Sequence, residues 1–168
     1  VARLKKGRRM EELEQFALND SMTGMYNRNA YDYFVKNERD FEGYVIVTFD
    51  LNNLKQCNDQ YGHRAGDEYI INAAHIIEDN FERYGKCYRI GGDEFCCIIP
   101  KGRYFKIERV MHKIDQDVEV LNHKNIIPVP VGIAYGYAVF TADDTDPEKV
   151  RERADEDMYR NKKTMKQL

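Results

Sequence analysis

Acidic side chains stand at two points of the sequence where strands are expected to end or turn. Asp50 closes the apolar run 44–51, and Asp93 and Glu94 follow the glycine pair 91–92. If these two strands are neighbours, the three carboxylates meet at one sheet edge, where like charges raise one another's pKa values unless a cation lies between them. Such oxygen ligands suit Mg²⁺ together with a nucleotide's phosphates. The competing interpretation is a solvated hairpin turn, because Gly and Asp are ordinary turn formers.

The polar segment 51–67 offers a second set of groups that could bind a nucleotide. Backbone amides at 52–54, with Lys55 beside them, could hold phosphate oxygens as an anion nest does. Asn58 and Asp67 could read a base edge, and guanine presents N–H donors that suit a carboxylate. The alternative is an ordinary polar loop that ends in a helix cap.

Basic residues near the end of the chain and before the glycine pair are further candidates. Lys162 and Lys166 are four residues apart in a predicted helix, an arrangement that costs an isolated helix ~0.2–0.5 kcal/mol unless an anion lies between the charges. A solvated basic helix end, favoured by the helix dipole, explains them equally well. Arg89 points either to solvent or to the acidic sheet edge, and His63 alone is more typical of a structural or surface histidine.

Composition limits the classes of protein to which the chain can belong. Its 168 residues fit one domain, and a formal charge of −3 gives no overall positive field that would attract nucleic acid. No apolar run approaches the ~20 residues that span a bilayer, so we expect no membrane contact by this segment. The cysteines at 57, 87, 96 and 97 lack zinc-site spacing, and no secretory signal precedes them. We therefore expect reduced thiols in a cytoplasmic domain, with Cys96 and Cys97 in the core.

Periodicity predicts an alternation of helices and strands around these groups. Apolar residues at helical spacing predict five helices, and β-branched and aromatic runs predict four strands. The segment 52–67 is expected to be a loop, and 87–99 an antiparallel hairpin. A hairpin excludes an all-parallel sheet and favours an antiparallel or mixed sheet with helices on one or both faces. The helices are expected at 5–18, 27–37, 66–81, 104–121 and 146–164, and the strands at 44–51, 87–90, 95–99 and 131–140.

Five motifs in this order resemble the diguanylate cyclase catalytic domain, named GGDEF after its hairpin. They are RIGGDEF (89–95), SMTGMYNR (21–28), FDLNNLKQCNDQYGHRAGD (49–67), AYGYA (134–138) and ADEDMYRNKK (154–163). The resemblance covers nearly the whole chain. It implies an α+β fold with a ferredoxin-like, palm-type antiparallel or mixed sheet flanked by helices, as in nucleotide cyclases. It also implies that residues 1–19 are a signalling or linker helix and that 20–168 are the catalytic domain.

The resemblance also implies a role for each matching residue. Asp93 would accept the proton of the ribose 3′-hydroxyl, and Arg89 would neutralise charge that develops on the phosphates. The implied ligands of Mg²⁺ (or Mn²⁺) are Asp50, the carbonyl of Leu51, Asp93 and Glu94. The implied GTP-binding residues are Asn53, Leu54, Lys55, Asn58, His63, Asp67, Lys162 and Lys166.

The implied reaction condenses two GTP molecules into cyclic di-GMP with release of two pyrophosphates. It needs a homodimer with two-fold symmetry, because one domain binds one GTP, and members of the family are usually controlled by an upstream sensor. Glu82 and Gly85 replace the Arg-x-x-Asp of members with product inhibition, so we expect no feedback site of that kind. Two alternatives remain: a regulatory module that responds to GTP or cyclic di-GMP without turnover, and a dimerisation or scaffold domain.

Overall fold

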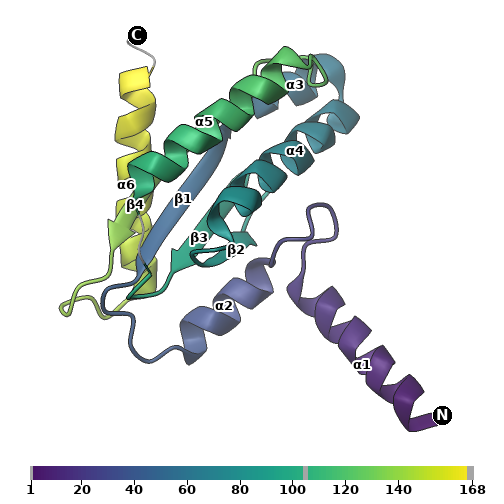
Figure 1. Ribbon diagram of the computed structural model, residues 1–168, viewed down its shortest axis with the longest axis vertical. Helices are drawn as coiled ribbons and strands as arrows, with labels where there is room; N and C mark the ends of the chain where they lie inside the picture. The colour runs from purple at the N-terminus through teal and green to yellow at the C-terminus, as the bar shows by residue number, and fades with distance from the viewer. Residues whose placement is uncertain (1, 104–105, 166–168) are drawn as a thin grey trace.

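A four-stranded sheet forms the centre of the molecule (Figure 1). The structure is a computed structural model, and it describes residues 2–103 and 106–165. The spatial order is β2-β3-β1-β4, and every pairing between neighbours is antiparallel, so the expected α+β class is confirmed. The strands are β1 (Val45–Asn52), β2 (Lys86–Arg89), β3 (Glu94–Ile99) and β4 (Gly132–Val139).

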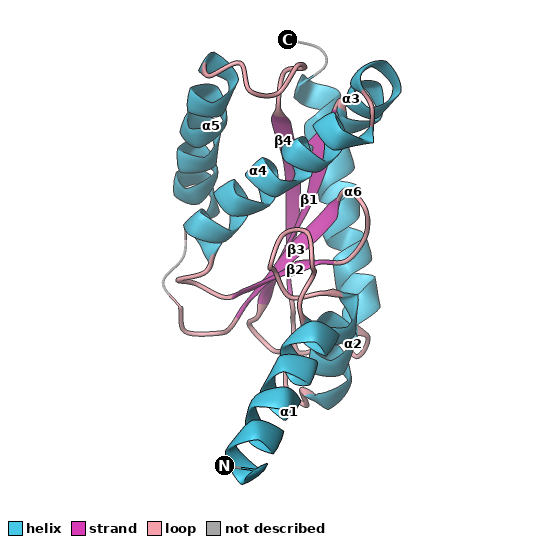
Figure 2. Ribbon diagram, turned by 90° about the vertical axis from the view of Figure 1, so that its right-hand side faces the viewer, coloured by secondary structure: helices cyan, strands magenta, loops and turns pink. Residues whose placement is uncertain are grey.

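Helices cover both faces of this sheet (Figure 2). One face packs against α4 and α5, and the other packs against α6 and α2. The division follows from the alternation of side chains along each strand. The helices are α1 (Ala2–Leu18), α2 (Arg28–Asn37), α3 (Leu54–Tyr61), α4 (His63–Phe81), α5 (Ile107–His123) and α6 (Pro147–Met165).

The larger core lies between the sheet and the pair α4 and α5. Phe49 of β1 meets Phe81 of α4 edge to face at 5.3 Å, and Ile114 of α5 is fully buried beside them. The helical spacing of apolar residues in α5 is confirmed, although the predicted start at 104 lies outside the described residues. Cys96 and Cys97 are both fully buried, as expected for core residues.

The predicted loop 52–67 is wrong, because most of it is helical. Leu54 and Cys57 are three residues apart and both are buried, so they form the inner face of α3. Gly62 has φ 87°, a left-handed value that favours glycine, and it separates α3 from α4. As a result α4 starts at His63, earlier than expected.

Helix α6 lies directly on β4. Asp146 accepts a hydrogen bond from the Glu148 amide at 3.0 Å, which confirms the predicted cap. A Cβ at Gly136 would lie 2.1 Å from the Met158 amide nitrogen, so only glycine allows the two backbones to approach this closely. The close approach predicted at Gly136 is confirmed.

Helix α1 extends away from the sheet (Figure 1). Its end is tied to α2 through Asn27, whose side chain donates to the Ala17 carbonyl at 2.9 Å and accepts from the Ala30 amide at 3.0 Å. Met10 and Leu13 are 58% and 59% exposed. Among the described helices, none combines the length and apolar character that crossing a membrane requires. The division of the chain at residue 19 stays a prediction.

Candidate active site

The acidic residues of the two motifs lie on neighbouring strands. Asp50 of β1 and Glu94 of β3 are direct cross-strand partners, and Asp93 precedes Glu94 in the turn. All three line one cavity of about 190 Å³. Like charges directly opposite each other destabilise a sheet, so this arrangement calls for a positive partner. Within residues 2–103 and 106–165, however, no three Asp, Glu, His or Cys side chains are close enough to bind a metal ion.

The glycine pair forms the turn between β2 and β3. The amides of Ile90 and Gly91 both donate to the Glu94 carbonyl, at 3.0 and 3.3 Å. Neither Gly91 nor Gly92 has a positive φ. A Cβ at Gly91 would lie 3.0 Å from the Glu94 carboxylate, so glycine at this position leaves room for that acid.

Arg89 is bound within the protein at the base of the same turn. Its guanidinium donates to the Asp20 carboxylate at 3.1 and 3.2 Å and to the Gly92 carbonyl at 2.9 Å, and its side chain is 12% exposed. Burial raises the pKa of Asp20, but hydrogen bonds from Thr23 and Arg89 outweigh it and leave that pKa below its usual value. The side chain therefore does not point to solvent, and Arg89 is not among the described residues that line the acidic cavity. The guanidinium joins the segment before α2 to the hairpin.

Lys162 supplies positive charge at the acidic edge. Its ammonium group forms an ion pair with Asp50, and the two side chains are 26% and 23% exposed. The contact joins residues that are 112 positions apart in sequence. Lys166, the other predicted phosphate ligand of this helix, lies outside the described residues.

Among the other residues that line the cavity, Thr48, Arg151, Asp155 and Met158 received no role from the sequence. Burial raises the pKa of Asp155. The Thr48 side chain and the charge of Arg151 partly offset this rise, and the charge of Asp50 adds to it. Thr48 is only 3% exposed, and in the described part of the chain its hydroxyl makes no hydrogen bond of full geometry, although it lies near enough to Asp155 to lower the pKa of that acid. The spacing could have revealed Thr48, because it lies two residues before Asp50 on the strand and so points to the same face.

The three α6 residues that line the cavity lie on one face of their helix together with Lys162. Arg151, Asp155, Met158 and Lys162 are separated by four, three and four residues, which is the spacing of a helical stripe. Arg151 is held by Glu148 at 2.7 Å. A search for helical periodicity among polar residues, as well as apolar ones, would have grouped these residues on one helix face, but not shown what that face contacts.

The predicted phosphate-binding backbone lies at the start of α3. Asn53, the residue before the helix, has φ 64°, and its own side chain makes no capping hydrogen bond. A left-handed residue followed by helical ones turns successive amides to one side, which is the geometry of an anion nest. Lys55 is exposed in the first turn. Tyr69 anchors α4 here, because its hydroxyl donates to the Asn52 carbonyl at 2.5 Å.

The predicted base-reading residues gather where α3 meets α4. The Asn58 carboxamide lies over Gly66, where a Cβ would be 1.8 Å from its Oδ1. Asp67 follows Gly66 directly and is exposed, and His63 is exposed one turn earlier on α4. The structure thus brings Asn58 beside the helical turn that carries both residues. Their contact with a base stays a prediction.

The family is settled by comparison with known proteins. The model of the diguanylate cyclase GGDEF domain matches residues 17–167. The chain belongs to the GGDEF family. It is 30% identical over 160 residues to the bifunctional diguanylate cyclase/cyclic di-GMP phosphodiesterase MucR of Pseudomonas aeruginosa, an alignment covering 90% of this chain and 23% of MucR. It is 29% identical over 158 residues to the diguanylate cyclase DgcS of Shewanella oneidensis, covering 90% of this chain and 52% of DgcS.

Solved structures of GGDEF domains share the fold. The GGDEF domain of DgcB from Caulobacter crescentus, solved in complex with c-di-GMP, superimposes with a TM-score of 0.71 at 26% identity, over 88% of this chain and 91% of that one. The chain spans about half of DgcS and a quarter of MucR. The relatives therefore show the family and the fold of this segment.

Proposed function

We propose that this GGDEF domain condenses two GTP molecules into cyclic di-GMP. The observation that carries the proposal is the cross-strand pair of Asp50 and Glu94, which shares one cavity with Asp93 and has Lys162 as its positive partner. Acids at a sheet edge suit a nucleotide with its divalent ion. The diguanylate cyclase relatives support the same chemistry.

The oxygen donors at this edge are of the type that Mg²⁺ or Mn²⁺ binds, although the described carboxylates would have to move together to hold the ion. The donors would be the carboxylates of Asp50, Asp93 and Glu94 and the carbonyl of Leu51, which are the hard oxygen ligands that these ions take. Leu51 follows the last β1 residue that pairs with β3. A bound divalent ion lowers the pKa of an attacking hydroxyl and neutralises charge on the phosphoryl group. Lys162 would then leave its ion pair with Asp50 and bind the triphosphate.

The residues of the chain bind GTP and move one proton per bond formed. Asp93 accepts the proton of the ribose 3′-hydroxyl as its oxygen bonds to the α-phosphorus of the other GTP, and the bond from that phosphorus to the pyrophosphate oxygen breaks. Arg89 keeps the turn in place through Gly92 and neutralises charge on the leaving group. The triphosphate lies on the amides of Asn53 and Leu54 and on Lys55, Lys162 and Lys166, and the guanine contacts Asn58, His63 and Asp67.

Catalysis on this scheme requires two copies of the domain. Each chain provides one acidic cavity and so activates one 3′-hydroxyl, and two bonds must form. A homodimer with two-fold symmetry places the two bound nucleotides face to face. An upstream sensor would act through α1, whose Met10 and Leu13 are exposed.

Product formation by a dimerised form of the chain tests this proposal. Incubation with GTP and Mg²⁺ should give cyclic di-GMP and pyrophosphate, resolved by chromatography. Asp93→Asn should give no product, whereas Asp59→Asn, at an exposed acid of α3, should match the original chain. Equal product from the original chain and Asp93→Asn refutes the role of Asp93.

A regulatory module without turnover is the second candidate. It is favoured by the ion pair between Asp50 and Lys162 and by the separation of the acidic side chains in the described residues. Tight binding of GTP or cyclic di-GMP with no product at high protein concentration would establish this alternative. Absence of any GTP binding in Mg²⁺ would instead leave a dimerisation or scaffold role.

A further inference from the structure

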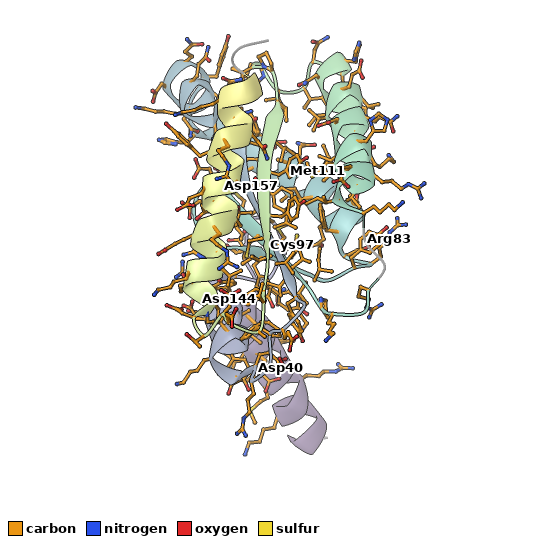
Figure 3. The ribbon with its side chains drawn as sticks, turned by 90° about the vertical axis from the view of Figure 1, so that its left-hand side faces the viewer. Asp40, Arg83, Cys97, Met111, Asp144 and Asp157 are labelled. Carbon is orange, nitrogen blue, oxygen red and sulfur yellow. The ribbon has the colours of Figure 1, made fainter. Side chains whose placement is uncertain are left out.

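The outer edge of β4 is bound by side chains of α6. β4 is the last strand of the sheet, and the free backbone groups of an edge strand need protection against pairing with other chains. Three polar residues of α6, which we call the edge ladder, form hydrogen bonds with these groups. Figure 3 labels one of them, Asp157. Arg153 donates to the Val139 carbonyl at 3.0 Å, Asp157 accepts from the Tyr137 amide at 3.0 Å, and Asn161 donates to the Tyr135 carbonyl at 2.9 Å.

The spacing of the edge ladder matches the helix to the strand. Its members recur every four residues of α6, and their partners recur every two residues of β4 in the opposite direction. Four helical residues rise ~6.0 Å and two strand residues extend ~6.7 Å, so the two repeats differ by less than about 1 Å per step. A shift of α6 along its axis by one turn would break all three bonds together. The ladder therefore defines the axial position of α6.

Gly136 brings the helix within reach of the edge. A Cβ there would lie 2.1 Å from the Met158 nitrogen and 2.2 Å from the Ala154 carbonyl oxygen. The glycine fixes the distance between the two backbones but offers no side chain to fix where along β4 the helix stops. The edge ladder supplies that missing constraint.

Lys162 follows Asn161, the last member of the ladder. The lysine side chain is long and flexible, so its ion pair with Asp50 depends on where its backbone is held. We propose that Arg153, Asp157 and Asn161 are positioning residues, which set the axial register of α6 and so hold Lys162 at Asp50 and at the nucleotide phosphates. The phosphate part of this inference rests on the proposed function.

Variants at Asp157 separate the hydrogen bond from the charge. Asp157→Ala removes the acceptor for the Tyr137 amide, Asp157→Asn keeps an oxygen acceptor, and Glu152→Ala changes an exposed acid of the same helix. Two readouts need no turnover: hydrogen exchange of the Tyr137 amide and the NMR shift of the Lys162 ε-methylene. In Asp157→Ala the exchange should rise about two- to tenfold, the worth of one hydrogen bond, and the Lys162 signal should move. Asp157→Asn and Glu152→Ala should match the original chain.

Steady-state kinetics with GTP tests whether the edge ladder acts through Lys162. Asp157→Ala and Asn161→Ala should each raise KM for GTP about two- to tenfold with little change in kcat, as expected for loss of binding that is equal in ground and transition states. In a Lys162→Ala background the same changes should have no further effect, because residues that act through one another are not additive.

Different results would contradict the positioning role of the edge ladder and the proposed function. If the original chain neither binds nor converts GTP, the proposed function is wrong, and the exchange and Lys162 shift still decide the positioning role. If Tyr137 exchanges faster while the Lys162 signal keeps its original position, the ladder only protects the edge and the inference is overturned. Additive effects on KM in the Lys162→Ala background would overturn it as well.

Discussion

The two faces of β1 differ in what they carry. Val47, Phe49 and Leu51 face α4 and α5 and are all apolar and buried. The alternate positions face α6, and along them Ile46 is apolar, Thr48 is polar and Asp50 is acidic as the strand approaches the hairpin. Because side chains alternate in a strand, one segment anchors the main core and also presents an acid. The division separates most of the stability from the chemistry.

The α6 face adds buried polar contacts to its apolar packing. Tyr31, which is fully buried, donates to Glu148 at 3.0 Å, and Glu148 in turn binds Arg151 at the rim of the acidic cavity. Burial raises the pKa of Tyr31 well above its usual value, so this hydroxyl remains a donor. Polar networks in a low-dielectric interior hold a specific geometry only when each member is satisfied. The following predictions test this contrast.

The largest effect should come from the core face. Phe49→Ala removes a fully buried ring that packs on Phe81, and it should lower the free energy of unfolding by about 3–5 kcal/mol, measured by urea denaturation. Its neighbour on the other face gives the matched comparison. Thr48→Val replaces a buried hydroxyl that makes no hydrogen bond of full geometry in the described residues and only a weak contact with Asp155, so it should cost less than about 1 kcal/mol. Comparable losses from both would show that the two faces contribute alike.

The second effect concerns activity on the α6 face. Asp50→Asn should lower the rate of cyclic di-GMP formation at least about a hundredfold, as loss of one charge-stabilising group typically does. The change also removes the like charge opposite Glu94, so the unfolding midpoint should stay close to that of the original chain. An inactive variant that also unfolds early would place Asp50 among the structural residues.

The third effect tests the junction of α3 and α4. Gly66→Ala places a Cβ 1.8 Å from the Asn58 Oδ1 and so displaces that carboxamide. GTP should bind about two- to tenfold more weakly, the worth of one hydrogen bond, as measured by calorimetry. Asn58→Ala should produce the same loss, and the double variant should be no worse than either. Unchanged affinity in both single variants would remove Asn58 from the binding site.

The smallest effect is the pH dependence contributed by Asp155. Burial raises its pKa in the folded chain, so the folded state favours the neutral acid and folding carries a penalty once the group ionises. That penalty is absent below the ordinary pKa of about 4 and is fully present above the raised pKa. Relative to Asp155→Asn, the original chain should therefore lose stability as pH rises through this interval. A difference that stays constant with pH contradicts the assignment.

Local patterns were sufficient for most of the fold. The β1 run, the hairpin, the apolar stripe of α5 and the Asp146 cap each depend on neighbours close in sequence, and each was predicted. The segment 52–67 was not, because its polar composition obscured Leu54 and Cys57, whose spacing of three was the available signal. Asn53 and Gly62, the two left-handed residues that bound α3, suggest a turn when read without that spacing.

Contacts between distant segments were beyond the sequence. The ion pair of Lys162 with Asp50 and the hydrogen bonds of Arg89 to Asp20 join residues 112 and 69 positions apart. No periodicity specifies such pairs, because they depend on how α6 and the N-terminal segment pack on the sheet. The edge ladder belongs to the same class, although its spacing of four was visible in the sequence.

Binding of Mn²⁺ with a non-hydrolysable GTP analogue tests the central claim most directly. The paramagnetic ion broadens the NMR signals of nearby nuclei. The account predicts that Asp50, Asp93 and Glu94 lose their signals first, while Ile114 of α5, on the opposite face of the sheet, loses its signal later. Early loss at any other cluster of acids, or broadening spread evenly over the chain, would contradict the placement of the nucleotide's divalent ion at this edge of the sheet.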